Sequence, residues 1–213
     1  MMRELEAPLR RGLAELALAL DDSQVQQMLE YLALLAKWGR VYNLTGRLEP
    51  AEMLSHHLLD SLAIVKPLRR QCSGAPVRVL DVGAGAGLPG VVLAICCPDW
   101  QVDCVDAVAK KAAFVQQVAA NLRLLKLRGL HARVEKLTDR YDLLTSRAFA
   151  SLADFTQCSG RALADGGVWA AMKGKYPADE IAQLKPPANV FHVEPLVVPG
   201  LQAERCLVWL RRH

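Results

Sequence analysis

The chain has 213 residues, 52% of them hydrophobic, and a net charge of +4 at pH 7. This length and composition suit one large α/β domain with a modest extension and a substantial core. No stretch approaches the ~20 consecutive apolar residues of a membrane helix. Charged residues interrupt positions 1–20, so the sequence excludes both a membrane span and a secretory signal. We therefore expect a soluble cytoplasmic protein, whose mild positive charge permits a polyanionic partner without requiring one.

The cysteines form neither a Cys-x-x-Cys pair nor a pattern with the spacing of metal ligands. They are Cys72, Cys96, Cys97, Cys104, Cys158 and Cys206. Free thiols in a reducing compartment explain them, and we expect no metal.

Residues 1–72 are predicted to form a helical extension, distinct from the domain of residues 73–213. An amphipathic helix begins at Ser23, where Ser23 and Gln26 have the spacing of a capping box, and ends near Gly39. The polar turn Tyr42-Asn-Leu-Thr45 follows it, and Pro50 begins another helix.

The second helix carries His57, Asp60 and Ser61 on one face, because residues three and four apart are neighbours on a helix. There is no His-Glu-x-x-His pattern and no third ligand nearby, which disfavours a metal site. Two interpretations stay open. The cluster either fixes the helix against its neighbours or faces a substrate.

A glycine-rich turn follows the first predicted strand. Residues 77–82 form the near-continuous apolar run of a strand buried on both faces, and Gly83, Gly85 and Gly87 follow at once. These glycines permit a sharp turn and a close approach of a ligand to the backbone. The stretch therefore predicts a small-molecule site above the turn.

Asp81 is the residue that discriminates between ligands. The segment Gly85-Ala-Gly-Leu-Pro-Gly90 also satisfies the Gly-x-Gly-x-x-Gly pattern of dinucleotide sites, which alone is a weak signal. A carboxylate at the end of the strand would repel a pyrophosphate but not a cationic ligand. S-adenosylmethionine carries a sulfonium and an ammonium group, so the motif favours it over NAD. A turn without a ligand is the third possibility.

From residue 77 onward, short apolar runs alternate with helical segments, which predicts parallel βαβ units in an α/β fold. The predicted strands are 77–82, 101–106, 130–134, 141–146, 167–173, 190–198 and 205–211, and the predicted helices lie near 89–97, 108–125, 151–164 and 178–184. The last two strands are expected to form a hairpin that closes an edge of the sheet.

Polar residues fall at the carboxyl ends of predicted strands, where open α/β sheets bind ligands. Asp106 lies about twenty residues beyond the glycines, in the position of an acid that binds ribose hydroxyls. The loop at Val134 and Glu135 could meet an adenine ring. Arg147 and Lys173 lie at the ends of two further predicted strands, which places Arg147 beside the ligand and Lys173 at the equivalent position.

Five motifs together resemble one known family, in order and over nearly the whole chain. They are Tyr42-Asn-Leu-Thr45, His57-Leu-Leu-Asp-Ser61, Asp81-Val-Gly-Ala-Gly-Ala-Gly-Leu-Pro-Gly90, Ser146-Arg-Ala-Phe-Ala-Ser151 and Met172-Lys-Gly174. The sequence is similar to the small-subunit ribosomal RNA methyltransferase G family, also called glucose-inhibited division protein B. Ala86 departs from the proline expected there in many relatives.

The resemblance implies a class I S-adenosylmethionine-dependent methyltransferase, with a Rossmann-like, mostly parallel seven-stranded sheet and helices on both faces. The implied reaction transfers a methyl group from S-adenosylmethionine to N7 of a guanine in 16S ribosomal RNA of the small ribosomal subunit. Together with the glycine motif, it predicts cofactor contacts at Asp81, Gly83, Gly85, Gly87, Leu88, Asp106, Val134, Glu135 and Arg147. The N-terminal helices, with Asn43, Thr45, His57 and Asp60, are the expected lid or RNA-docking surface, and Lys173 is a further substrate contact.

Residues that other reactions require are missing. The turn after the fourth predicted strand reads Ser-Arg-Ala-Phe, without the Asn/Asp-Pro-Pro-aromatic sequence used on exocyclic amines. Cys158 lies in a predicted helix rather than at a strand end, where cytosine C5 chemistry needs its nucleophile. Guanine N7 already has a nucleophilic lone pair, so Arg147 and Lys173 would act by position and charge, without a general base.

Two rival functions stay open, a nicotinamide-dependent oxidoreductase and a non-catalytic ribosome-binding factor. Basic residues at 123–128 could contact RNA, although such runs are more often solvated faces. We expect a monomer.

Overall fold

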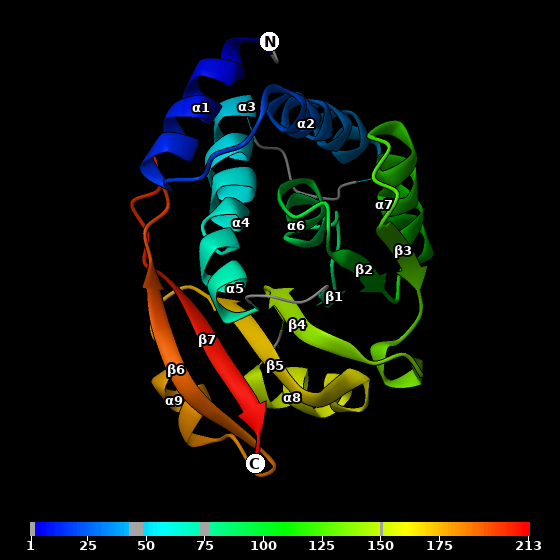
Figure 1. Cartoon of the computed structure of the whole chain (residues 1–213), viewed down its shortest axis with the longest axis vertical. Coiled ribbons are helices and arrows are strands. Elements are labelled where there is room, and N and C mark those ends of the chain that lie inside the picture. The colour runs from blue at the N-terminus through cyan, green and yellow to red at the C-terminus, as the bar shows by residue number, and fades with distance from the viewer. Residues whose placement is uncertain (1–2, 43–48, 73–76, 150) are drawn as a thin grey trace.

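The computed structural model describes residues 3–42, 49–72, 77–149 and 151–213. Within these residues, seven strands form one sheet in the order β3-β2-β1-β4-β5-β7-β6 (Figure 1). The strands are β1 (Arg78–Val82), β2 (Gln101–Asp106), β3 (Leu127–His131), β4 (Tyr141–Arg147), β5 (Leu163–Lys173), β6 (Ala188–Leu196) and β7 (Arg205–Arg212).

The strands from β1 to β5 pair in parallel, so their carboxyl ends meet at one edge of the sheet. β7 pairs antiparallel with both β5 and β6, and β6 is the outermost strand. The predicted mostly parallel sheet and its closing hairpin are confirmed.

Helices cover both faces of the sheet. The α-helices are α1 (Glu6–Glu15), α2 (Asp22–Tyr42), α3 (Pro50–Met53), α4 (Asp60–Leu62), α5 (Val65–Gln71), α6 (Gly90–Cys96), α7 (Ala109–Asn121), α8 (Leu152–Ser159) and α9 (Ala178–Ala182). Between α3 and α4 lies one π-helical segment, η2 (Leu54–Leu59), and short 3-10 turns are η1 (Arg3–Leu5), η3 (Val134–Lys136) and η4 (Gly160–Ala162).

The N-terminal helices share a hydrophobic core with one face of the sheet. Leu9 of α1, Leu35 of α2 and Leu68 of α5 belong to the same buried cluster as Val79 of β1 and Val102 of β2. A second cluster on the other face packs α8 and α9. The predicted boundary after residue 72 falls between α5 and β1, but the helices before it are part of the core.

Polar contacts fix α2 in place. Gln24 Nε2 donates to the carbonyl oxygen of Ile95 at 2.7 Å, and Gln27 Nε2 donates to that of Leu122 at 2.9 Å. The Tyr31 hydroxyl donates to the carbonyl oxygen of Ala86 at 2.7 Å. α2 therefore reaches α6, the end of α7 and the glycine turn after β1.

The predicted capping box at the start of α2 is wrong. The backbone N–H of Gln24 donates to Asp21 Oδ1 at 2.8 Å, and the backbone N–H of Asp21 donates to Gln24 Oε1 at 3.1 Å. The reciprocal pair is thus Asp21 with Gln24, because the helix begins at Asp22.

Three predicted strands differ from the structure by more than one residue at an end. β3 is Leu127–His131 rather than 130–134, and β6 is Ala188–Leu196 rather than 190–198. β5 ends at Lys173 as predicted but begins at Leu163 rather than 167. A Cβ at Gly129 would lie 2.3 Å from the carbonyl oxygen of Ala112, so β3 needs a glycine where α7 packs against it.

All six cysteines are free thiols. Within the described ranges, no group of three His, Cys, Asp or Glu side chains is arranged to hold a metal ion. A search of the same ranges finds no helix with the length and hydropathy to cross a membrane.

Candidate functional site

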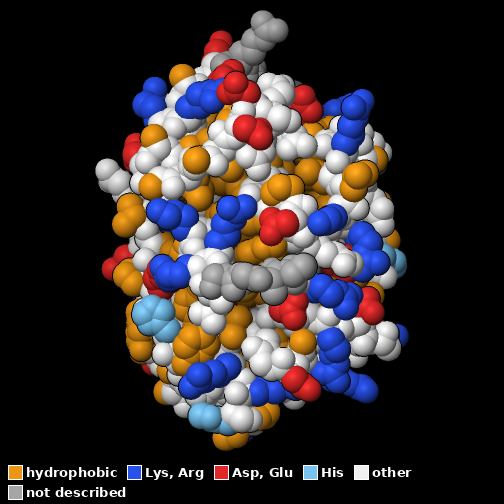
Figure 2. All heavy atoms as spheres, in the orientation of Figure 1, with side chains coloured by type: hydrophobic (Ala, Val, Ile, Leu, Met, Phe, Trp, Pro, Cys, Tyr) orange, Lys and Arg blue, Asp and Glu red, His pale blue; other side chains and the backbone are white. Residues whose placement is uncertain are grey.

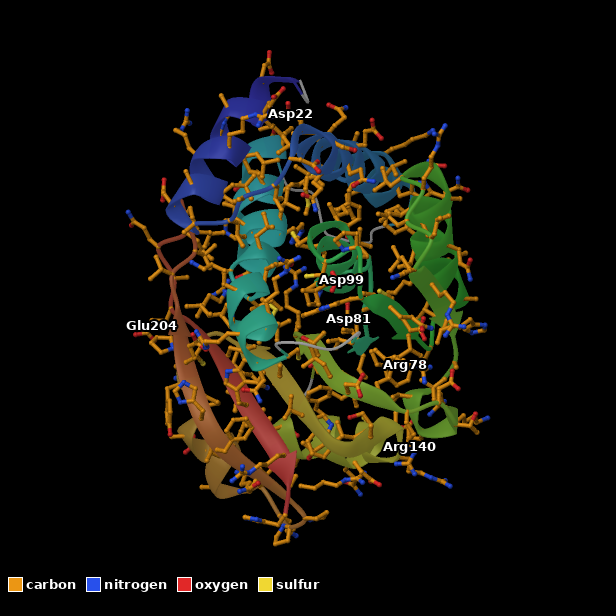
Figure 3. All side chains as sticks on the ribbon, in the orientation of Figure 1. Asp22, Arg78, Asp81, Asp99, Arg140 and Glu204 are labelled. Carbon is orange, nitrogen blue, oxygen red and sulfur yellow. The ribbon has the colours of Figure 1, made fainter. Side chains whose placement is uncertain are left out.

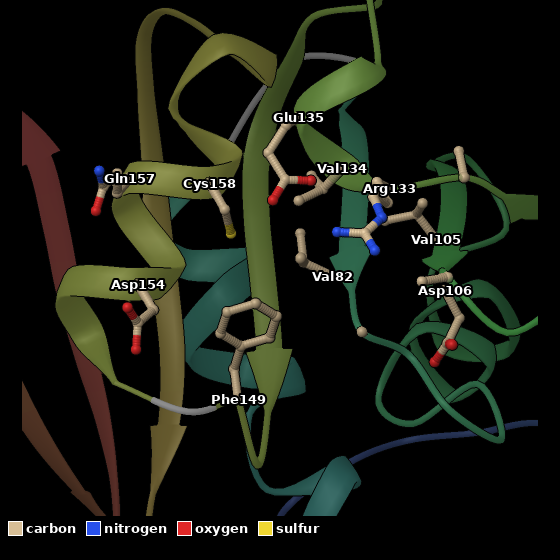
Figure 4. A pocket seen from close by; sticks show the side chains of 13 residues that line it. Val82, Val105, Asp106, Arg133, Val134, Glu135, Phe149, Asp154, Gln157 and Cys158 are labelled. Atoms are coloured by element: carbon tan, nitrogen blue, oxygen red, sulfur yellow. The ribbon is translucent and has the colours of Figure 1, made fainter.

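A cavity of about 830 Å³ opens at the carboxyl ends of β1, β2 and β4 (Figure 4). Open α/β sheets bind ligands at this edge, and the volume lies in the range of small-molecule sites. The lining residues are Val82, Gly83, Val105, Asp106, Ala107, Ala132, Arg133, Val134, Glu135, Phe149, Asp154, Gln157 and Cys158. Figure 4 shows Asp106 and Arg133 on one side of it and Asp154 and Gln157 of α8 on the other.

The glycine turn forms one wall of the cavity. The backbone N–H groups of Gly83 and Ala84 donate to the carbonyl oxygen of Val105 at 2.9 and 3.1 Å, which ties the turn to the end of β2. Gly87 has a φ of +87°, and a Cβ there would lie 2.5 Å from Val91 Cγ2. Glycine at this position therefore lets the turn close against α6.

Asp106 connects the glycine turn to the start of α7. Its Oδ2 accepts a 3.0 Å hydrogen bond from the N–H of Gly85, and its Oδ1 accepts one of 2.8 Å from the N–H of Val108. Lys111 Nζ lies 3.7 Å from Oδ2. These contacts fix the carboxylate at the cavity wall, and each oxygen keeps a lone pair for a further donor such as a ribose hydroxyl.

Apolar side chains line another part of the cavity. Val134 and Glu135 lie in η3, and Phe149 follows β4. The Phe149 ring packs on Phe155 of α8, with 5.7 Å between ring centroids. Val134 and Phe149 offer the kind of surface on which a planar heterocycle binds.

The residues of α8 complete the cavity. Ser151 caps the helix by accepting a 3.0 Å hydrogen bond at Oγ from the N–H of Asp154. Burial raises the pKa of the Cys158 thiol to about 11, so this thiol is protonated at neutral pH. A protonated thiol is a poor nucleophile.

The position of Asp81 differs from the expectation of a carboxylate exposed at the edge of the turn. The side chain is fully buried, and Oδ2 accepts a 2.8 Å hydrogen bond from the N–H of Gly90. Oδ1 is buried without a partner. Burial raises the pKa of Asp81 from 3.8 to about 7. Asp81 therefore caps the start of α6, and its contact with a ligand stays a prediction.

Arg147, at the end of β4, lies in a separate cluster with the N-terminal helices. Its Nη1 donates to the carbonyl oxygen of His56 at 3.0 Å and lies 3.4 Å from Asp60 Oδ2, and its Nη2 lies 3.5 Å from His57 Nδ1. Burial and the neighbouring Arg147 charge lower the pKa of His57, which favours the neutral imidazole. The structure thus brings three predicted site residues together, His57, Asp60 and Arg147.

Lys173, at the end of β5, is held by α9. Its Nζ lies 3.0 and 2.8 Å from the two carboxylate oxygens of Glu180. Glu180 Oε2 also accepts a 2.7 Å hydrogen bond from the N–H of Leu152, at the start of α8. An anionic ligand at Lys173 would therefore compete with Glu180.

The predicted site residues thus fall into groups. Gly83, Asp106, Val134 and Glu135 line the cavity, and Asn43 and Thr45 lie outside the described residues. Gly85, Gly87 and Leu88 belong to the turn behind the lining residues.

Sequence reasoning gave no role to several residues that the structure places at the site. Phe149 belongs to the motif Ser146-Arg-Ala-Phe-Ala-Ser151. Its position just after the end of a strand is a signal that could have identified it as a cavity residue. Asp154, Gln157 and Cys158 line the cavity from one helix, and their spacing alone does not distinguish them from a solvated face. From distant segments, Tyr31 donates a hydrogen bond to the Ala86 carbonyl in the glycine turn, and Arg205 donates one to Asp60. No local pattern predicts such contacts.

The basic residues at 123–128 are partly used within the fold. Arg128 makes two hydrogen bonds to Asp103, at 2.7 and 2.5 Å, and Lys126 Nζ donates to the carbonyl oxygen of Asp99 at 3.0 Å. Figure 2 shows Lys and Arg side chains gathered with acidic ones at the lower right of the view. They lie around the positions where Figure 3, in the same orientation, labels Arg78 and Arg140. Both labelled residues lie at the amino ends of strands, away from the cavity.

Comparisons with known proteins agree with this geometry. A model of the GidB family, described as rRNA small subunit methyltransferase G, matches residues 24–208. A ribosomal RNA small subunit methyltransferase G from Albidiferax ferrireducens is 63% identical, over 99% of both chains.

Two solved structures share the fold. A SAM-dependent methyltransferase from Aquifex aeolicus is 15% identical with a TM-score of 0.54, over 77% of this chain and 98% of that one. Coclaurine N-methyltransferase bound to N-methylheliamine and SAH is 11% identical with a TM-score of 0.56, over 92% of this chain and 74% of that one. The predicted class I methyltransferase fold is confirmed.

Proposed function

The chain belongs to the rRNA small subunit methyltransferase G family, and on that premise we propose that it transfers a methyl group from S-adenosylmethionine to N7 of a guanine in 16S ribosomal RNA. The observation that carries the proposal is the cavity at the ends of β1, β2 and β4, which Gly83, Asp106 and Phe149 line together with residues of α8.

The residues around the cavity fit S-adenosylmethionine. Asp106 is fixed with lone pairs available for ribose hydroxyls, and Val134 and Phe149 provide an apolar surface for the adenine. Buried side-chain atoms without a hydrogen-bond partner include His57 Nε2 and Asp81 Oδ1. Buried polar groups are normally paired, but neither His57 nor Asp81 lines the cavity, so these atoms do not bear on how the cavity fits the cofactor.

When bound, S-adenosylmethionine supplies a methyl group on a positively charged sulfur. The chain's own residues orient the acceptor base and place charge around it. Arg147 and Lys173 end neighbouring strands and present cationic groups that match a phosphate or the O6 edge of guanine.

N7 is the target that membership of the family implies, and residues that other methylations require are missing from the described part of the site, which supports it. The segment Ser146-Arg147-Ala148-Phe149 spans the end of β4 and the residues after it, without the Asn/Asp-Pro-Pro-aromatic sequence, and the thiol of Cys158 is protonated. A guanine N7 lone pair needs neither a base nor a covalent nucleophile. The target base must be single-stranded or splayed out of the RNA to reach the cavity.

We place the reaction in the cytoplasm, on the small ribosomal subunit, with the protein acting as a monomer.

The experiment that tests the proposal uses labelled S-adenosylmethionine and small subunits from a strain that lacks the gene. We expect label in the 16S RNA, and borohydride reduction followed by aniline cleavage should cut the chain at one N7-methylguanine. Subunits from the parent strain, already modified, are the control and should take up little label. Label on another atom of the base would contradict N7 as the target.

The two rival functions give different results. A ribosome-binding factor would bind the subunits and leave the RNA unlabelled. An oxidoreductase would bind NADH rather than S-adenosylmethionine in a calorimetric titration.

A further inference from the structure

Asp60 lies between two arginines from distant parts of the chain. Its Oδ2 is 3.4 Å from Arg147 Nη1, and its Oδ1 accepts a 2.8 Å hydrogen bond from Arg205 Nε. The Asp60 residue is only 4% exposed. Asp60 therefore joins the N-terminal helices to β4 and β7 at once.

Sheet register explains how the two arginines meet one carboxylate. Arg147 pairs with Met172 on β5, and the next residue, Lys173, pairs with Cys206 on β7. Because β7 runs antiparallel, its first residue, Arg205, lies at the same edge of the sheet as the last residues of β4 and β5. The fold thus brings these side chains together across the hairpin.

The contacts of Asp60 differ in strength. The 2.8 Å bond to Arg205 is a charge-assisted hydrogen bond of ordinary length, whereas the 3.4 Å contact with Arg147 is long. Arg147 has its shorter contact, 3.0 Å, with the carbonyl oxygen of His56, which is neutral.

The charges of this cluster do not cancel. One carboxylate faces two guanidinium groups. The lowered pKa of His57 favours the neutral imidazole, which contributes no charge. Arg205 satisfies the Asp60 charge, so the positive charge of Arg147 stays available to a ligand. A buried carboxylate that lost its only cation would be strongly destabilised. With Arg205 in place, Asp60 keeps a counterion when Arg147 turns toward a ligand.

We propose that Asp60 and Arg205 are positioning residues for Arg147: Asp60 orients the guanidinium at the end of β4, and Arg205 holds Asp60. This rests on the proposed function, in which Arg147 acts on the cofactor or the RNA. It gives Asp60 a role within the protein in place of the predicted contact with the substrate, and it gives Arg205 a role in the reaction.

The test is a double-mutant cycle between Arg205→Gln and Arg147→Ala. We expect Arg205→Gln alone to lower kcat/KM for methylation of small subunits at least about tenfold. In the Arg147→Ala background, the same change should lower it less than about twofold, because the residue through which Arg205 acts is gone. Arg205→Lys, which keeps the charge, should stay within about threefold of wild type.

Arg70→Gln is the matched control. Arg70 Nη2 also binds a carboxylate, Glu194 Oε2 at 2.7 Å, but its side chain is 64% exposed on α5. We expect the kcat/KM of the Arg70→Gln variant to stay within about twofold of wild type. Thermal unfolding of every variant identifies those that fail to fold. If Arg205→Gln fails to fold, Asp60→Asn, which removes the carboxylate that Arg205 binds, replaces it in the cycle.

If the fold losses in kcat/KM of the two single variants multiply in the double variant, the residues are not coupled and the proposal is overturned. Normal turnover of Arg205→Gln would also overturn it. The same cycle, measured on the Kd of S-adenosylmethionine by calorimetry, does not depend on the RNA. Wild-type protein that labels no RNA would refute the proposed function. Coupling between the two substitutions in the Kd of S-adenosylmethionine would still support the positioning role, and the absence of coupling in both kcat/KM and Kd would refute that role.

Discussion

The hydroxyl of Tyr31, on α2, donates a 2.7 Å hydrogen bond to the carbonyl oxygen of Ala86 in the glycine turn. Both residues are buried, so Tyr31→Phe would leave the Ala86 carbonyl without this donor. We expect the free energy of unfolding, measured with urea, to fall by ~1–3 kcal/mol. The Kd of S-adenosylmethionine should rise as well, because α2 supports the turn that lines the cavity.

Tyr141→Phe is the control for that change. The Tyr141 hydroxyl donates to Asp103 at 2.8 Å and is buried, but neither residue lines the cavity. This variant should lose stability with no change in Kd. Equal Kd values for the two variants would refute a role of Tyr31 in supporting the site.

Gly90→Ala should destabilise the protein strongly. The added Cβ would lie 2.3 Å from Cys104 Sγ and 2.9 Å from Asp81 Oδ2, both buried. We expect a loss of ~1–3 kcal/mol or more in urea unfolding, as for other overpacked cores. Cys104→Ala added to Gly90→Ala should recover part of the loss, since it removes the closest atom.

Gly160→Ala provides the comparison, because a Cβ there would meet Arg212 Nη2 at an ordinary 3.6 Å. Its unfolding free energy should stay within ~0.5 kcal/mol of wild type. A similar loss at the two glycines would show that steric contact at Gly90 is not the cause.

Asp81 should make stability depend on pH. Burial raises its pKa from 3.8 to about 7, so between these values the folded protein holds a proton that the unfolded chain has released. The resulting stabilisation is fully present below pH 3.8 and is lost as the pH rises through about 7. Relative to Asp81→Asn, the wild-type free energy of unfolding should fall by up to about 4 kcal/mol over this range. Parallel pH profiles of the two proteins would contradict the assignment.

Arg147→Ala should reduce kcat/KM for subunit methylation at least ~100-fold if Arg147 places charge in the transition state. Its thermal unfolding should change little, because Asp60 keeps its 2.8 Å bond to Arg205. Arg140→Ala is the control at the amino end of β4, where Arg140 Nη1 donates to the carbonyl oxygen of Leu163 at 2.9 Å. Near-normal turnover of Arg147→Ala would remove this residue from the reaction.

Alkylation of Cys158 should report on occupancy of the cavity. Burial raises the pKa of both Cys158 and Cys72 to about 11, so iodoacetamide should react slowly with each at pH 7 and faster as the pH rises. S-adenosylmethionine should protect Cys158, which lines the cavity, and leave Cys72 unprotected. Mass spectrometry of the modified peptides measures both rates in one sample, and equal protection would contradict binding in this cavity.

Sequence patterns predicted well the strands that turn residues bound on both sides. The apolar run before the glycines and the strand that ends in Asp106 lie within one residue of β1 and β2, because turn residues bound them on both sides. The predicted bounds of β3 were wrong because Gly129 resembles a strand break. In the structure, Gly129 lies within the strand and leaves room for the backbone of α7. That requirement depends on packing between elements, which a local pattern does not contain.

The same division holds for the site. Gly83 and Asp106 occupy positions set by strand ends, and the structure places them at the cavity. The Asp81 side chain points toward Gly90 because the start of α6 offers it an N–H donor, and sequence spacing gives no direction for a side chain. Arg205 joins Asp60 across 145 residues, a contact that depends on the position of β7 in the sheet.

That position has a consequence for biosynthesis. β7 is the last strand of the sequence, yet it lies between β5 and β6. While the chain is being translated, the amino-terminal helices and the five parallel strands emerge first. The outer hairpin can be inserted only when Arg205 to Arg212 have left the ribosome. A nascent chain in which Arg205 has not yet left the ribosome therefore carries an incomplete Asp60 cluster, in which Asp60 lacks the 2.8 Å hydrogen bond from Arg205.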